Sequence, residues 1–383
     1  MKDLFLLRPD MTFLNHGSFG ACPRPVFDRY QAWQRELESQ PVEFLGRRFS
    51  SLMQEARASL AAHLRVAAND VVFVPNATTG INIVARSLAL RPGDEVLSTD
   101  HEYGAMTRTW RFVCRQHDAV FATRSITLPV DDPAAVVDAV WAGVTPRTRV
   151  LFMSHITSPT ALTLPVRDLC QRARAAGILT VIDGAHSLGQ LDLDLTALGA
   201  DFVSGNCHKW LCAPKGAGYL YAHPAVQDLV EPLVVSWGWQ SDTPGSSRFV
   251  DYLEWQGTDD FSAYLTVPAA IEFQRAHDWP RVRTRCNELV RLARQGISEL
   301  TGLPPICPDD RTWFTQMATL PLPPCHAARL QACLWEAERI EVPVITWNGA
   351  PFIRVSVQGY NTEEDVQRLL AALARWLPQG LEE

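Results

Sequence analysis

Long apolar stretches, dense runs of one charge and paired cysteine motifs are all missing from this sequence of 383 residues. No segment has the roughly 20 consecutive apolar residues that cross a bilayer, and the first residues do not read as a signal peptide. A net charge of −7 without a Lys/Arg-rich run gives little support for nucleic-acid binding. The nine cysteines lack framework or zinc spacing. We therefore expect a cytoplasmic protein with reduced thiols, no membrane association and no metal site.

The order of apolar segments predicts an α/β fold with a second, smaller domain. Between about residues 70 and 222, short apolar runs alternate with helical periodicity, which indicates a mostly parallel sheet with helices on both faces. After about residue 260, amphipathic helices over 287–300 and at the C-terminus flank a strand over 353–357 and indicate a smaller α+β domain. The proline-rich segment 302–324 is expected to be a connection. The expected strands of the large sheet are 71–74, 95–98, 119–122, 150–153, 178–182, 201–203 and 218–221.

These signals divide the chain into three expected parts. They are an N-terminal segment over 1–20, a large domain over 21–260 and a small C-terminal domain over 261–383. In an open α/β sheet, ligands bind outside the carboxyl ends of the strands. The polar residues that follow the expected strands are therefore the first candidates for a functional site.

Lysine is scarce, because the chain has only Lys2, Lys209 and Lys215. Lys209 stands in His-Lys-Trp just after an expected strand, whereas Lys2 is terminal and Lys215 lies in a glycine-containing loop. Burial and the neighbouring His208 would lower the pKa of Lys209 toward the neutral amine, the form that attacks an aldehyde. The alternative is a solvated loop lysine; scarcity and context favour the functional role.

Asp183 ends the apolar strand Ile-Leu-Thr-Val-Ile, where a carboxylate is costly without a partner. The alternative is a turn residue that stabilises Gly184 and a following helix. However, an acid at the end of one strand and a lysine after the next is the arrangement that pyridoxal 5′-phosphate requires. Lys209 would form the Schiff base and Asp183 would keep the pyridine nitrogen protonated, so that the ring acts as an electron sink. His186 could then contact the phenolic oxygen of the cofactor.

Three further positions fit the same ligand, each with a plainer alternative. The segment Asn-Ala-Thr-Thr-Gly at 76–80 leads from a strand into a helix, where free N–H groups and hydroxyls suit a phosphate, although threonines also cap helices. Tyr103 could stack on the ring, with His101 as its rival. Arg354 interrupts an apolar strand and could bind a substrate carboxylate, or could form a structural ion pair.

Taken together, these motifs resemble the class V aminotransferase branch of fold-type I pyridoxal phosphate enzymes, and most closely the isopenicillin N epimerase-like proteins. The similarity runs nearly end to end, and eight motifs occur in the order of the family. They are LNHGSFG (14–20), NATTG (76–80), DHEY (100–103), SHITSP (154–159), DGAH (183–186), HKW (208–210), GT (257–258) and RVS (354–356) with YN (360–361).

The resemblance implies a role for each candidate residue. Lys209 would carry the cofactor, Asp183 would pair with its ring nitrogen and Tyr103 would stack on the ring. The resemblance further implies a homodimer in which one subunit reaches the phosphate bound by the other. The remaining implied contacts are Thr78 and His208 to the phosphate, Thr258 to the phosphate from a second subunit, Ala77, Thr79, His186 and Asn206 to the cofactor, Arg354 to the substrate α-carboxylate, and Asn15, His16 and Ser158 on the substrate side.

The resemblance also implies a reaction. The enzyme would form an external aldimine with an amino acid and labilise a bond at Cα, with Lys209 as general base. Epimerisation or racemisation is favoured, with Tyr103, His16 or water as the donor on the opposite face. The alternatives are C–S β-elimination from a cysteine conjugate or sulfoxide, and transamination. A cysteine desulfurase is disfavoured because residues 345–354 contain no cysteine. A non-catalytic cofactor-binding module is disfavoured because Lys209, Asp183 and Arg354 are all present.

Overall fold

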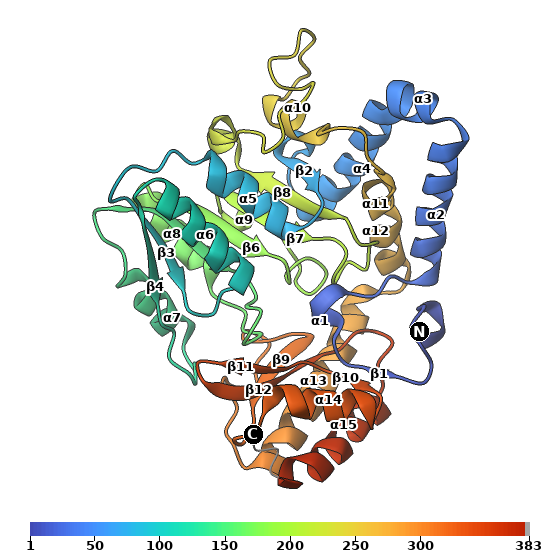
Figure 1. Ribbon diagram of the computed structural model, residues 1–383, viewed down its shortest axis with the longest axis vertical. Coiled ribbons are helices and arrows are strands. Elements are labelled where there is room, and N and C mark those ends of the chain that lie inside the picture. Colours follow the sequence, from blue (N-terminus) through green and yellow to red (C-terminus); the bar gives the residue numbers. More distant parts are fainter. Residues whose placement is uncertain (380–383) are drawn as a thin grey trace.

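The predicted alternation of strands and helices builds a seven-stranded sheet in the order β2-β8-β7-β6-β5-β3-β4. In the computed structural model, which describes residues 1–379, β8 runs antiparallel to both of its neighbours and the other neighbouring strands are parallel (Figure 1). The α/β fold with a mostly parallel sheet is thus confirmed. The strands are β2 (Val71–Val74), β3 (Glu95–Thr99), β4 (Val120–Arg124), β5 (Thr148–Ser154), β6 (Leu179–Gly184), β7 (Phe202–Asn206) and β8 (Gly218–Ala222).

Helices cover both faces of this sheet, which explains why its central strands are apolar on both sides. One face packs against α5, α6 and α10, where the rings of Trp110 and Phe152 lie 5.6 Å apart. The other face packs against α4, α7, α8 and α12. These helices and those beside them are α2 (Arg24–Ser39), α3 (Pro41–Glu43), α4 (Phe49–Leu64), α5 (Ala77–Ser87), α6 (Gly104–Gln116), α7 (Pro133–Trp141), α8 (Val166–Ala175), α9 (Leu195–Leu198), α10 (Arg248–Glu254), α11 (Ser262–Leu265) and α12 (Val267–Ala276).

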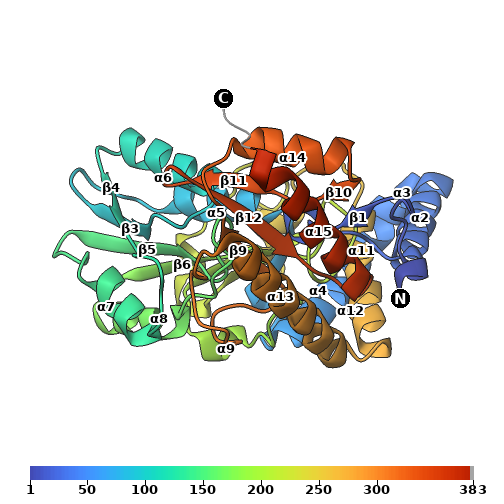
Figure 2. The same ribbon diagram turned by 90° about the horizontal axis from the view of Figure 1, so that it is seen from below.

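A second, antiparallel sheet lies below the first, in the order β11-β12-β9. Helices α13, α14 and α15 pack around it (Figure 2). The predicted helices and strand are confirmed, although α13 begins eight residues earlier than expected. The elements are α13 (Trp279–Thr301), β9 (Met317–Pro321), α14 (Ala327–Glu336), β10 (Ile340–Glu341), β11 (Val344–Trp347), β12 (Ala350–Ser356) and α15 (Glu363–Trp376).

The expectation that 302–324 is only a connection is wrong in part, because β9 lies within it. The prolines that suggest a loop flank this strand: Pro304, Pro305 and Pro308 precede it, and Pro321, Pro323 and Pro324 stand at or after its end. Pro321 can pair with Phe352 because β9 is an edge strand, where a missing N–H is tolerated. A short strand bounded by prolines gives too weak an alternating pattern to detect.

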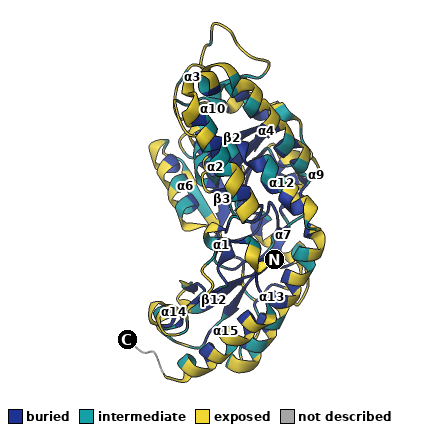
Figure 3. Ribbon diagram, turned by 90° about the vertical axis from the view of Figure 1, so that its right-hand side faces the viewer, coloured by how far each residue is buried: buried dark blue, intermediate teal, exposed yellow. Residues whose placement is uncertain are grey.

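The N-terminal segment joins the two sheets. Strand β1 (Thr12–Phe13) pairs with β10, and the short helix α1 (His16–Phe19) lies between the upper and lower parts of the molecule (Figures 1 and 3). Gly20 has φ +70°, and a Cβ atom there would lie 2.1 Å from the carbonyl oxygen of His208. The N-terminal segment therefore passes directly over the backbone that carries Lys209. The domain limits near residues 20 and 260 stay predictions.

Among residues 1–379, no helix is both long enough and apolar enough to cross a membrane.

Candidate active site

A hollow of about 470 Å³ opens at the carboxyl ends of the parallel strands. Asp183 is the penultimate residue of β6, Asn206 ends β7 and Asn76 follows β2, so one edge of the sheet supplies all three. Most of the predicted site residues meet here. The hollow is lined by Gly17, Ser18, Phe19, Asn76, Ala77, Thr78, Tyr103, Ser154, Ile156, Ser158, Asp183, Ala185, His186, Asn206, His208, Lys209 and Arg354.

Asp183 is a buried carboxylate with an incomplete set of partners. Within residues 1–379, its side chain accepts one hydrogen bond, from the N–H of Ala185 at 2.9 Å. Burial raises the pKa of Asp183, while that N–H and the charge of Lys209 lower it. No basic side chain of the described residues lies within ion-pair distance of this carboxylate, which therefore fits the protonated ring nitrogen of a bound cofactor.

The amine of Lys209 lies beside a histidine whose tautomer is fixed. The Nε1–H of Trp210 donates to Nδ1 of His186 at 3.2 Å, so the proton of the neutral imidazole must be on Nε2. That Nε2 lies 3.3 Å from Nζ of Lys209 and can donate only to an uncharged amine. Burial and the charge of Arg354 lower the pKa of Lys209 to about 8, and burial also lowers the pKa of His186. The site thus raises the fraction of the neutral, nucleophilic amine above that of an ordinary lysine.

The first turn of α5 leaves donors available for an anion. The side chain of Asn76 accepts from the N–H of Thr79 at 2.9 Å, and the side chain of Asn206 accepts from the N–H of Ala77 at 2.9 Å. Neither the N–H nor the hydroxyl of Thr78 has a hydrogen-bond acceptor elsewhere in residues 1–379. His208 lies nearby, with its Nδ1 bound to the carbonyl of Ala217 at 3.0 Å, and burial lowers its pKa to about 4. A phosphate fits this helix N-terminus.

Arg354 is a buried cation without a carboxylate partner in the part of the chain that the structure describes. Its Nη1 donates to the carbonyl and hydroxyl oxygens of Ser158, at 2.7 and 3.2 Å, and its Nη2 donates to the hydroxyl of Ser18 at 3.1 Å. Its Nε is buried without a partner. Burial lowers the pKa of Arg354 to about 10, so the guanidinium remains charged at neutral pH and fits an anionic group of a substrate.

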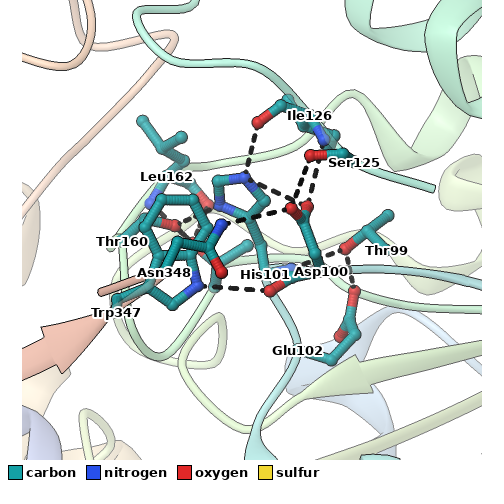
Figure 4. A network of polar contacts seen from close by, with 11 residues as sticks. Thr99, Asp100, His101, Glu102, Ser125, Ile126, Thr160, Leu162, Trp347 and Asn348 are labelled. Carbon is teal, nitrogen blue, oxygen red and sulfur yellow. Dashed lines mark hydrogen bonds and ion pairs between the residues drawn. The ribbon is translucent and has the colours of Figure 1, made fainter. Parts of the chain in front are cut away.

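The structure separates Tyr103 from its rival His101. Tyr103 lines the hollow and is 48% exposed, whereas His101 is fully buried. His101 binds Thr160 through Nδ1 at 2.7 Å and the carbonyl of Ile126 through Nε2 at 2.9 Å, and its ring packs 4.5 Å from that of Trp347 (Figure 4). Both nitrogens of His101 are therefore occupied by structural contacts.

Four predicted site residues do not line the hollow. Thr79 caps α5, and Asn15 donates to Glu341 at 2.9 Å. His16 is fully buried between the hydroxyl of Tyr360 and the carbonyl of Lys209, each at 3.0 Å, and burial lowers its pKa to about 3. Thr258 lines a separate hollow of about 250 Å³.

Several lining residues went unnoticed in the sequence, notably Ser18, Phe19, Ser154 and Ile156. Their motifs were visible, but small or apolar residues carry no chemical signal of their own. Glu102, one residue before Tyr103, is also not predicted as a site residue, although its carboxyl group is buried.

Comparison with known proteins agrees with this geometry. The sequence profile "Aminotransferase class-V" matches residues 20–369. Isopenicillin N epimerase of Amycolatopsis lactamdurans is 40% identical over 96% of this chain and 95% of its own length, and that of Streptomyces clavuligerus is 38% identical over the same shares. A probable chloroplastic L-cysteine desulfhydrase of Arabidopsis thaliana is 27% identical, over 95% of this chain and 82% of its own length.

Solved structures share the fold. A cysteine desulfurase, CsdA from Escherichia coli, has a TM-score of 0.82 at 22% identity, covering 99% of this chain and 98% of that chain. The cystine C–S lyase C-DES, solved in complex with its product cysteine persulfide, has a TM-score of 0.81 at 24% identity, covering 96% of this chain and 98% of that chain. The architecture is that of fold-type I enzymes.

Proposed function

The chain belongs to the aminotransferase class-V family and is a pyridoxal 5′-phosphate-dependent enzyme, and from this premise we propose that it is an amino-acid epimerase or racemase similar to isopenicillin N epimerase. One observation carries the proposal. Lys209, whose amine has a pKa lowered to about 8, shares one hollow with the unpaired carboxylate of Asp183 and the uncompensated guanidinium of Arg354. The 40% identity to an isopenicillin N epimerase over nearly the whole of both chains supports the choice of reaction.

The residues around the hollow divide into a cofactor side and a substrate side. Pyridoxal phosphate, when bound, withdraws electrons from the Cα atom of an amino acid and weakens its bonds. We assign Asp183 to the ring nitrogen, Thr78 and His208 to the phosphate, and Tyr103 to the face of the ring. Ala77, Thr79, His186 and Asn206 support these contacts. Arg354, held by Ser18 and Ser158, binds the α-carboxylate and so orients the substrate.

Inversion at Cα needs proton-transfer groups on both faces of the substrate. Lys209 is poised near neutral pH to take the Cα proton on its own face, because its pKa is lowered to about 8. Inversion requires a donor on the other face. His16 does not suit this role, since both of its nitrogens are engaged behind Lys209. Tyr103 is the phenol among the lining residues, and we assign the second proton to its hydroxyl or to a water molecule that it holds.

A C–S β-lyase is the second candidate. The desulfhydrase of Arabidopsis thaliana supports it at lower identity than the epimerases have. A lyase needs the same Lys209 but no second proton donor. Transamination ranks third. A cysteine desulfurase is disfavoured, because no cysteine is among the residues that line the described hollow.

The enzyme is proposed to be a homodimer with shared sites. Exposed apolar side chains at Leu233, Val234, Val235 and Trp237 form a surface of the kind that subunits bury. Val234 also lines the hollow of Thr258, so the proposed phosphate contact from Thr258 of the partner subunit lies beside this surface. Nine free thiols fit a reducing cytoplasm. We further propose that the chain divides into an N-terminal segment over 1–20, a large domain over 21–260 and a small domain over 261–383.

The test is to incubate the purified, cofactor-loaded enzyme in D₂O with isopenicillin N and, separately, with amino acids and cysteine conjugates. Deuterium at Cα together with inversion, seen by NMR and chiral chromatography, is the expected result. Release of ammonia and a 2-oxo acid from cysteine conjugates, without inversion of any substrate, would instead establish the lyase. The Lys209→Ala variant is the control for reactions that do not need the enzyme's amine.

A further inference from the structure

A second buried carboxyl group lies close to Asp183 and has no assigned role. Glu102, between β3 and α6, is only 7% exposed. Its Oε1 lies 2.6 Å from the hydroxyl of Thr99, and its Oε2 lies 2.6 Å from the hydroxyl of Ser154; the first contact is drawn in Figure 4. No Lys, Arg or His side chain in residues 1–379 forms an ion pair with it. Burying a charge in this way would be costly, so the protonation of Glu102 matters.

The two neighbours of Glu102 both belong to the wall of the hollow. Tyr103 follows it directly in the chain, and Ser154 is bound to it by a hydrogen bond. Ser154 ends β5 and pairs in register with Asp183 of β6. Glu102 thus joins, from behind, the loop that carries Tyr103 to the strand end beside Asp183.

Charge balance indicates which of the two carboxyl groups is ionised. Asp183 receives an N–H and the field of Lys209, whereas Glu102 receives two hydroxyl groups and the backbone N–H of Ser154 but no stabilising cation. Of the elements around Glu102, β3 provides the hydroxyl of Thr99, β5 provides the hydroxyl of Ser154, and β6 provides the like charge of Asp183. Helix α6 begins with Gly104, which has no side chain to pair with Glu102. Burial, with a further contribution from Asp183, raises the pKa of Glu102 to about 7. One ring nitrogen can compensate one carboxylate but not two.

We propose that Glu102 is a positioning residue of the cofactor pocket, which in its protonated form ties the Tyr103 loop to Ser154 and leaves Asp183 as the single anion for the ring nitrogen. This rests on the cofactor role proposed for Asp183. The protonated Oε2 donates to the hydroxyl oxygen of Ser154, and the hydroxyl hydrogen of Ser154 is then free to turn into the hollow.

The experiment compares Glu102→Gln with Glu102→Ala. The amide keeps one acceptor and one donor, as the protonated acid does, but cannot ionise. We expect Glu102→Gln to bind pyridoxal phosphate within about twofold of the wild-type dissociation constant, and Glu102→Ala to bind it about tenfold more weakly. In the absorbance of the bound cofactor, a titration step near pH 7 should be present in the wild type and absent from Glu102→Gln.

Two results would overturn the inference. One is equal weakening of cofactor binding by Gln and Ala, which would mean that the ionised carboxylate is required. The other is a pH profile of Glu102→Gln that coincides with that of the wild type.

Glu95→Gln is the control, since Glu95 is a buried carboxyl at the opposite end of β3; it should leave the dissociation constant and the profile unchanged. If Glu102→Ala does not fold, Ser154→Ala removes the same link and should weaken binding about threefold. A wild-type protein that bound no cofactor would refute the proposed function itself, before any variant is compared.

Discussion

The cofactor side and the substrate side of the hollow are built in different ways. On the cofactor side, Asp183, Asn206 and Lys209 lie at or just after neighbouring strands of one sheet. On the substrate side, Arg354 of β12 meets Ser18 of α1, from which it is separated by 336 residues in sequence. The first arrangement follows from the order of strands, whereas the second exists only once the N-terminal segment and the small sheet have docked. Cofactor binding and substrate binding should therefore be separable by substitution.

The two sides also use buried cations differently. Lys209 and Arg354 are both buried without a carboxylate partner in the described residues, and burial is the largest cause that lowers the pKa of each. The pKa of Lys209 falls to about 8, whereas that of Arg354 falls only to about 10. The same burial thus yields a lysine that can lose its proton near neutral pH and an arginine that stays a fixed anchor for an anion.

The largest effect is expected from Lys209→Ala, which should lower kcat by about 10³-fold or more, because it removes both the group that binds the cofactor covalently and the base. Single-turnover deuterium exchange at Cα measures this loss. Lys215→Ala is the matched control, since Lys215 donates to the carbonyl of Gly20 and does not line the hollow. A Lys209→Ala enzyme with kcat near that of the wild type would remove the basis of the assignment.

A smaller effect is expected from Arg354→Gln, on the substrate side. Loss of the charge should raise KM by about 100-fold, with the absorbance of the bound cofactor unchanged, because a buried partner of the α-carboxylate is removed. Initial-rate kinetics and cofactor titration give the two quantities. Ser18→Ala, which removes one hydrogen bond to Arg354, should raise KM about fivefold. If Arg354→Gln instead lost its cofactor, the two sides would not be independent.

The sequence predicts the cofactor side better than the substrate side, for the same structural reason. Apolar runs that end in Asp183 or precede Lys209 mark strand ends, and the carboxyl ends of parallel strands meet at one edge. Ser18 and Ile156 carry no such signal, because their place in the hollow depends on how distant segments pack. His16 shows the converse case: its motif predicts the substrate side, whereas its ring lies behind Lys209, against Tyr360. Glu102 was missed because a carboxyl held by two hydroxyl groups has no recognisable spacing.

An intermediate effect is expected on the stability of the cofactor-free protein. The unfolded state binds more protons at Lys209 than the folded state between about pH 8 and the ordinary value of 10.5, so this lysine makes the unfolding free energy rise with pH in that window. Below about pH 8, Lys209 is charged in both states, and burial of this charge lowers the unfolding free energy by its full, constant amount. Lys209→Met should therefore be more stable than the wild type by about 2 kcal/mol at pH 7, and the difference should shrink above pH 8.

Chemical denaturation of both cofactor-free proteins at several pH values measures this difference. Arg354→Met is the comparison, since the pKa of Arg354 lies near 10 and any difference from the wild type should stay constant through pH 8. A difference for Lys209→Met that did not change with pH would show that the pKa of Lys209 is not lowered in the folded, cofactor-free protein.

The smallest effect is expected where the two sides touch. In the hairpin between β11 and β12, Nε1 of Trp347 donates to the carbonyl of Asp100 at 3.2 Å, at the base of the loop that carries Tyr103 (Figure 4). Trp347→Phe removes this hydrogen bond but keeps an aromatic ring against His101. A neutral hydrogen bond contributes about 1 kcal/mol, so KM should rise about fivefold. The dissociation constant of the cofactor should change less than twofold, because Asp183, Lys209 and α5 do not depend on the hairpin and the Glu102–Ser154 hydrogen bond still holds the Tyr103 loop. Trp335→Phe, in α14, is the control. Weaker cofactor binding in Trp347→Phe would mean that the small sheet helps to build the cofactor side.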